Sequence, residues 1–239
     1  MTETPMLGLP LVQPSQAQKH VTVNEALARI DALGQLVIAS RATSTPPSAP
    51  EEGTVHAVPA GAVNAWAGQE GQLALFLNGG WAFIAARAGW QGWIADEGTP
   101  ALFDGSVWVA GTGAASPNGA ASTLRVIEAD HTVGAGAISD TGALIPAQSL
   151  VIGITGRVLT TITGTATSWR LGIGGVSDDR YGSGLGLSAG SWARGLTSSP
   201  LAYYSDTALT LTGEGGAFDG AGGIVRLAVH VIELALPRA

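Results

Sequence analysis

The most polar cluster in the C-terminal half of the chain is Asp178-Asp179-Arg180-Tyr181, and glycines flank it on both sides. Adjacent carboxylates in a loop can hold Ca²⁺ or accept hydrogen bonds from sugar hydroxyls, but they can equally well solvate a turn. Trp192, Tyr203 and Tyr204 follow in the same stretch, which we expect to be rich in loops. Exposed aromatic rings can stack on the apolar face of a sugar, whereas buried rings fill a core. These residues form the candidate glycan-binding set, with core packing as the alternative.

Residues for catalysis or metal binding are sparse. The histidines are His20, His56, His131 and His230, and their spacing matches no metal-ligand motif. The absence of cysteine excludes disulfides, thiolate catalysis and cysteine-based zinc sites. Gly182-Ser183-Gly184 lacks the frame of a nucleophile elbow, so we interpret it as a turn.

A glycosidase needs two carboxylates that face each other across a groove. The C-terminal half could supply them from Asp178, Asp179, Asp206, Glu214 and Asp219, although spacing alone does not bring any two together. We therefore predict a protein that is not an enzyme, with no catalytic residues, no cofactor and no metal.

The composition restricts the classes of partner. Charged residues make up 12% of the chain, against about 25% in typical domains. The net charge is −7 and Lys19 is the only lysine, which argues against nucleic acid as a partner and against a basic helix on a membrane surface. No apolar run is long enough to span a membrane, and residues 1–10 do not resemble a secretory signal, so we expect synthesis in the cytoplasm and no membrane insertion.

The first fifty residues predict an arm, a helix and a linker. Residues 1–21 are rich in Pro and Gln, and their apolar side chains, including Leu9 and Leu11, suggest an arm that docks on another surface. Residues 22–41 predict one helix, which could bundle with copies of itself or pack on its own β domain. Residues 42–52 contain three prolines and predict a stiff linker. The apolar stripe of the helix consists of Leu27, Ile30, Leu33 and Val37.

Residues 53–110 predict a small β domain with a tryptophan core. Asn78-Gly79 and Asp104-Gly105 each separate two apolar runs, which is the strongest short signal for a hairpin. Five of the seven tryptophans fall in this segment. Residues 111–121 consist mostly of small residues and predict a flexible linker and a domain boundary.

Residues 122–239 predict a tip domain with the fold of an antiparallel β-sandwich or jelly roll. Apolar runs separated by Ser, Thr and Gly clusters recur without a helical period. Val225, Leu227, Val229 and Val231 alternate with their neighbours, as in a half-buried strand. The chain as a whole is therefore predicted to be mainly β.

The stretch from Leu9 to Leu27 contains the unusual run Gln16-Ala17-Gln18-Lys19-His20. Further on come Gly79-Gly80-Trp81, Gly89-Trp90 with Trp93, and Phe103-Asp104-Gly105 with Trp108. In these positions the N-terminal half, over about residues 7–110, resembles a family of uncharacterised domains found in alphaproteobacterial prophages and gene transfer agents, most specifically in the stretch from Leu9 to Leu27.

The resemblance implies a tail fibre or spike of a phage-like particle. Its N-terminal part would attach to baseplate proteins, and it would carry no catalytic residues. The expected location is the tail of the particle, acting outside the cell, with a host-surface polysaccharide as receptor of the tip and a homotrimer as the assembly. Two alternatives stay open: a carbohydrate-cleaving tailspike, and a free secreted lectin-like module.

Overall fold

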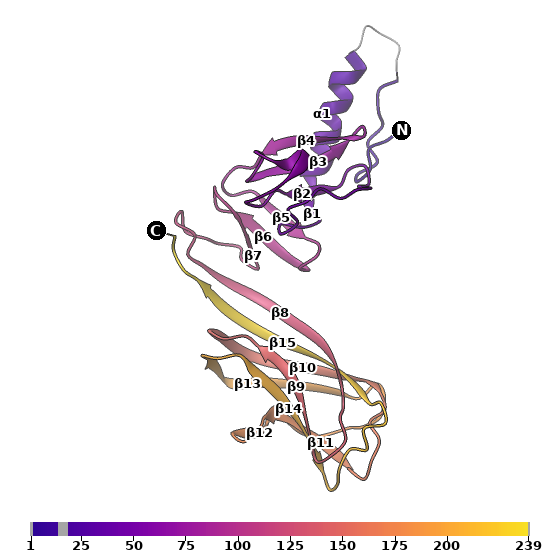
Figure 1. Ribbon diagram of the computed structural model, residues 1–239, viewed down its shortest axis with the longest axis vertical. Coiled ribbons are helices and arrows are strands. Elements are labelled where there is room, and N and C mark those ends of the chain that lie inside the picture. Colours follow the sequence, from indigo (N-terminus) through magenta and orange to yellow (C-terminus); the bar gives the residue numbers. More distant parts are fainter. Residues whose placement is uncertain (1, 14–18, 239) are drawn as a thin grey trace. The chain divides into compact units, whose positions relative to one another are not determined.

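The helix lies further toward the N-terminus than its sequence predicts. In a computed structural model, which describes residues 2–13 and 19–238, α1 spans Lys19–Gly34 rather than 22–41 (Figure 1). Gly34, a poor helix former, ends it. The following residues Val37–Ile38 form strand β1, because β-branched side chains favour extended backbone. The chain divides into a first unit, Met1–Ala121 with Ala235–Ala239, and a second unit, Ser122–Leu234.

The predicted apolar stripe of the helix is split between core and solvent. Ala32 and Leu36 belong to the core of the first unit, and Leu33 packs against it. Ile30 is 57% exposed, Leu27 is half-buried and Val37 is exposed on β1. The expectation of a single stripe was therefore wrong, because the small side chains of the helix, rather than Leu27 and Ile30, face the sheet.

The N-terminal arm packs against the helix of its own chain. The buried carboxylate of Asp31 on α1 accepts hydrogen bonds from the Thr4 hydroxyl (2.6 Å), the Leu7 amide (2.6 Å) and the Met6 amide (2.9 Å). Burial acts to raise the pKa of Asp31, but these hydrogen bonds outweigh it and hold the pKa below its usual value. Leu9 and Leu11 are half-buried within this arm.

The first unit is built on one seven-stranded mixed sheet with the order β4-β3-β2-β1-β5-β6-β7. The short β1 is central and pairs in parallel with β2 and β5, whereas the outer pairings are antiparallel. Residues 42–52, the predicted linker, connect β1 to β2 within this sheet. The other strands are β2 (Val55–Ala57), β3 (Gln72–Leu77), β4 (Gly80–Ala85), β5 (Gln91–Ile94), β6 (Thr99–Phe103) and β7 (Trp108–Ala110).

Both predicted hairpins are confirmed. Asn78 and Gly79 have positive φ between β3 and β4, where Leu77 pairs with Gly80. Asp104 opens a longer turn between β6 and β7, and its carboxylate accepts the amides of Ser106 and Val107. The second carboxylate oxygen of Asp104 binds Arg238 at 2.5 Å, so the C-terminal segment returns to the first unit.

Tryptophan fills the core of the first unit on the face of the sheet that carries His56. Trp66 is fully buried, and its ring lies 5.1 Å from the ring of His56 and 5.0 Å from that of Trp81. Burial lowers the pKa of His56, and the nearby charge of Asp96 only partly opposes this. The predicted tryptophan core is thus confirmed, with Trp93 as a partly exposed exception at 45%.

The second unit is a jelly roll. Its two four-stranded sheets have the orders β13-β10-β15-β8 and β12-β11-β14-β9, and the core lies between them. Strands that follow one another in sequence mostly belong to different sheets, which is the double-sheet Greek-key arrangement of this fold. The strands are β8 (Ala121–Thr132), β9 (Ile138–Ile145), β10 (Ser149–Thr160), β11 (Ser168–Ile173), β12 (Ser177–Leu185), β13 (Trp192–Tyr203), β14 (Thr207–Glu214) and β15 (Ile224–Ala235).

The predicted β-sandwich is confirmed, but the expectation of a loop-rich stretch around residues 178–204 was wrong. This stretch contains β12 and β13. The inward positions of β13 are small, as at Ala193 and Gly195, so the strand lacks the apolar alternation that reveals a half-buried strand.

Gly195 shows why these inward positions are small. A Cβ at this position would overlap the carbonyl oxygen of Tyr181 and come within 2.6 Å of its Cα. At Gly195, strand β12 therefore passes so close to β13 that no side chain fits there.

Candidate functional site

The structure distributes the predicted glycan-binding residues over different environments. Tyr181 is 1% exposed and Tyr203 is 8% exposed, and their hydroxyls share a hydrogen bond of 2.8 Å inside the core. Burial raises the pKa of Tyr181, so its phenol stays protonated. Both tyrosines are core residues, so their assignment to a binding surface is corrected: the alternative of core packing holds for them.

The acidic residues of the predicted cluster lie on β12, in the sheet β12-β11-β14-β9. Asp178 on β12 pairs with Arg170 at 3.2 Å, and Arg170 also approaches Glu214 at 3.7 Å. Glu214 accepts hydrogen bonds from the Ser168 hydroxyl and the Gly184 amide, of which the first most strongly holds its pKa below the usual value. These groups tie β11, β12 and β14 together. Of the remaining predicted residues, Asp179 and Tyr204 are exposed and Arg180 is half-buried.

The other candidate carboxylates for a glycosidase hold turns. Asp206 accepts the Ala147 amide, and Asp219 accepts the Thr163 hydroxyl and the Ala221 amide. Within the described ranges, no three His, Asp or Glu side chains are grouped so that they could hold a metal ion.

Trp192 is the member of the predicted set that lines a groove. It lies at the start of β13, is 61% exposed and contributes to a groove of about 420 Å³ on the outer face of the sheet β13-β10-β15-β8. Tyr204 follows the opposite end of β13, since Trp192 pairs with Arg157 and Tyr203 with Ser149. The two exposed aromatic residues therefore do not share a surface patch.

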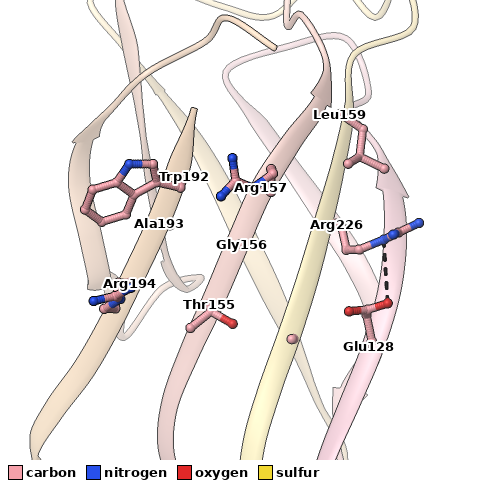
Figure 2. A pocket seen from close by; sticks show the side chains of 10 residues that line it. Glu128, Thr155, Gly156, Arg157, Leu159, Trp192, Ala193, Arg194 and Arg226 are labelled. Atoms are coloured by element: carbon pink, nitrogen blue, oxygen red, sulfur yellow. Dashed lines mark ion pairs between the residues drawn. The ribbon is translucent and has the colours of Figure 1, made fainter. Parts of the chain in front are cut away.

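Strand register determines which residues line the groove. Arg157 on β10 pairs with Trp192 on one side and with Arg226 of β15 on the other, so these side chains form a row across three strands (Figure 2). The next row on the same face consists of Arg194, Thr155 and Ala228. The complete lining consists of Glu128, Thr155, Gly156, Arg157, Leu159, Trp192, Ala193, Arg194, Arg226 and Ala228.

The three arginines differ in how far their charge is neutralised. Arg226 binds both carboxylate oxygens of Asp130, at 2.7 and 2.8 Å, and approaches Glu128 at 3.6 Å. Arg157 donates one hydrogen bond to the Gly190 carbonyl at 3.0 Å. The guanidinium of Arg194 lies 5.7 Å from the ring centre of Trp192. In the described part of the chain, neither Arg157 nor Arg194 forms an ion pair.

The groove continues along the sheet into a smaller, mostly apolar hollow of about 200 Å³. Thr155 and Arg194 line both hollows. At the far side, His230 forms a hydrogen bond of 3.1 Å with the Thr155 hydroxyl, and Leu196 is 82% exposed. The face thus combines an exposed indole, hydroxyl and guanidinium donors, and apolar surface, which together match the mixed polar and apolar faces of a sugar.

Sequence reasoning missed Glu128, Thr155, Arg157, Arg194 and Arg226. One local signal was available, because Trp192 and Arg194 occupy alternate positions and must share a face if the segment is a strand. Arg157 and Arg226 could not have been found in this way. Their proximity depends on the pairing of β10 with β13 and β15, strands that lie far apart in the sequence.

Residues 23–109 match the model of a family described as a protein of unknown function, DUF2793. A chain of the cyanophage Pam1 capsid asymmetric unit matches at 23% identity and a TM-score of 0.34, covering 47% of this chain and 84% of that chain. No curated protein matches. Within the parts that the structure describes, no helix has the length and hydrophobicity of a membrane span.

Proposed function

We propose that this chain is an attachment fibre of a phage-like particle, and that the groove around Trp192 binds a glycan on the host surface. The observation that carries the proposal is the exposed indole of Trp192 next to two guanidinium groups that form no ion pair with the described residues. Jelly rolls occur among lectins and viral capsid proteins, so the fold of the second unit is compatible with this role. The resemblance of the N-terminal half to prophage and gene transfer agent domains supports a place in such a particle.

Replacing Trp192 with alanine is expected to abolish measurable glycan binding while leaving the fold intact, because the ring is exposed and supplies the stacking surface. The measurement is binding of the full-length protein to lipopolysaccharide and capsular polysaccharide purified from alphaproteobacterial strains. Tyr204→Ala is the matched control, since Tyr204 is equally aromatic, is 78% exposed and lies outside the groove.

Two results would contradict the proposed site. Loss of binding in Tyr204→Ala, with Trp192→Ala unaffected, would move the site to the opposite end of β13. Absence of binding in the wild-type protein, with a trimerising tag fused to ensure avidity, would make this chain a structural connector instead.

The first unit would supply assembly and attachment to the tail. Val23, Leu27 and Ile30 follow one another at helical spacing on α1, and Val23 and Ile30 are exposed on the side away from the buried Ala28 and Ala32. We propose that this face joins copies of the chain in a homotrimer, whose several tips would strengthen a weak single-site interaction.

Ile30→Glu is expected to shift the protein from trimer to monomer, because the charge would be buried at every helix contact. Sedimentation equilibrium gives the mass of each species. Val21→Glu is the control, since Val21 is also exposed on α1 but does not share the face of Ile30. A monomeric wild-type protein would disprove the proposed trimer.

The two alternative functions make different predictions. A tailspike enzyme would release new reducing ends from the polysaccharide to which it binds, and the proposed fibre would not. A free lectin-like module would be missing from purified particles. Mass spectrometry of particles collected after prophage induction therefore tests whether the chain is a component of the particle.

A further inference from the structure

We infer that the sugar bound at Trp192 carries a negative charge, as a uronic acid or a phosphate- or sulfate-substituted residue does. This inference rests on the proposed function, because it specifies the ligand of the same groove. Three of the eleven lysine and arginine residues of the chain line the groove, although the net charge is −7. An acidic protein does not attract an acidic polymer over its whole surface. The local concentration of guanidinium groups therefore indicates that an anionic ligand is selected at this groove.

The hydrogen bonds and ion pairs of each arginine restrict the proposed anion-binding role to two of the three. Arg226 is held by Asp130 in a bidentate pair, which neutralises its charge and occupies its donors. Arg157 uses one hydrogen bond to a neutral carbonyl, and its remaining N–H groups are free of hydrogen bonds to described residues. Arg194 contacts the face of Trp192 and forms neither a hydrogen bond nor an ion pair with the described residues.

Strand geometry places these two charges around one sugar-sized position. Arg157 is the register partner of Trp192 on the neighbouring strand, at a spacing of about 4.8 Å. Arg194 lies two residues further along β13 on the same face, at a spacing of about 6.8 Å. Figure 2 shows Arg157 on the strand beside Trp192 and Arg194 further along β13. A carboxylate or phosphate on a pyranose ring stacked on the indole therefore has guanidinium donors nearby on two strands.

Glu128 lines the groove on the side opposite Trp192. It lies on the edge strand β8 and pairs with Arg226, as Figure 2 shows. A polymer with a negative charge on every residue would meet this carboxylate and Asp130 on one side of the groove. The arrangement therefore favours one anionic unit at Trp192 flanked by neutral units, and disfavours a uniformly charged chain such as DNA.

The test compares a uronic acid-containing bacterial polysaccharide with the same polymer after chemical reduction of its carboxyl groups to alcohols. We expect the full-length wild-type protein to bind the reduced polymer about tenfold more weakly, and to lose affinity for the native polymer as NaCl is raised. Arg157→Gln and Arg194→Gln are each expected to weaken binding of the native polymer about tenfold and to leave binding of the reduced polymer nearly unchanged.

Two further variants separate the groove from a general effect of charge. Arg87→Gln removes one positive charge from an exposed position in the first unit and should leave both affinities unchanged. Arg226→Gln should have a smaller effect than Arg194→Gln, because Asp130 already neutralises that guanidinium.

The failures of the inference and of the proposed function are distinguishable. Equal binding of native and reduced polymer, with both lost in Trp192→Ala, would overturn the anionic ligand and leave the glycan site in place. Binding of neither polymer would count against the proposed function itself. Duplex DNA that competes as well as the native polymer would overturn selection of a sugar, because it would show general attraction to polyanions.

Discussion

Replacing Trp169 with alanine is expected to destabilise the second unit by about 4 kcal/mol. Trp169 lies on β11, is 1% exposed and belongs to the core between the two sheets. Its indole N–H donates a hydrogen bond of 2.9 Å to the Gly186 carbonyl. The substitution leaves a cavity of nearly a whole indole in a close-packed interior and removes the partner of that carbonyl.

Urea unfolding measures this loss of stability. The unfolding is monitored by a signal that distinguishes the second unit from the first. At a slope of about 2 kcal/mol per molar, the midpoint of the second unit is expected to fall by about 2 M. Trp169→Phe keeps most of the apolar volume and should cost about half as much. Trp192→Ala is the matched control, because its ring is exposed and its removal should change stability by less than about 0.5 kcal/mol. Equal losses in Trp169→Ala and Trp192→Ala would contradict the placement of the two rings.

Replacing Asp31 with alanine is expected to destabilise the first unit by about 3 kcal/mol and to release the N-terminal arm. The carboxylate accepts three hydrogen bonds from the arm, and its loss leaves the Thr4 hydroxyl and the Met6 and Leu7 amides without their acceptor. Released arm residues become accessible to proteases. The measurements are urea unfolding of the first unit and the rate of limited proteolysis near the N-terminus.

The contribution of Asp31 also depends on pH in a predictable direction. Its pKa in the folded protein lies below its usual value, so the unfolded chain binds this proton more readily. The stabilisation is therefore complete above the pKa of the unfolded state, about 3.9, and is lost as the pH falls through the pKa of the folded state. The stabilities of wild type and Asp31→Ala are expected to converge in strong acid. A constant difference between wild type and Asp31→Ala over the acid range would show that Asp31 is not bound as the structure indicates.

Thr4→Val, which removes one of the three donors to Asp31, should reduce the free energy of unfolding by about 1 kcal/mol.

Local signals in the sequence were sufficient for the class of fold and for several of its elements. Asn78-Gly79 predicted a hairpin because its two residues tolerate positive φ, and the turn between β3 and β4 has that conformation. The alternation from Val225 to Val231 predicted the strand β15, whose inward side chains are fully buried. These features depend on neighbours along the chain, so a single sequence contains the information.

Features that depend on contacts between distant segments could not be predicted in the same way. Tyr181, Trp192 and Tyr203 are all aromatic residues in one polar stretch, and nothing local distinguishes them. The packing of two sheets buries Tyr181 and Tyr203 against each other and leaves Trp192 outside. Ile30 was expected in the buried stripe of the helix but is exposed, whereas the small Ala32 is buried in the core against the sheet.

The sequence by itself determined a β-rich protein with little charge, a tryptophan core in its first unit, and a C-terminal sandwich with exposed aromatic candidates. The tertiary structure alone decided the groove. Arg157, Trp192 and Arg226 lie on three strands separated by long stretches of chain, and their alignment follows from antiparallel register. A shift of one residue in that register would turn these side chains to the opposite face of the sheet. The buried alternation on the inner face holds the register, and through it the core of the sandwich positions the residues of the surface.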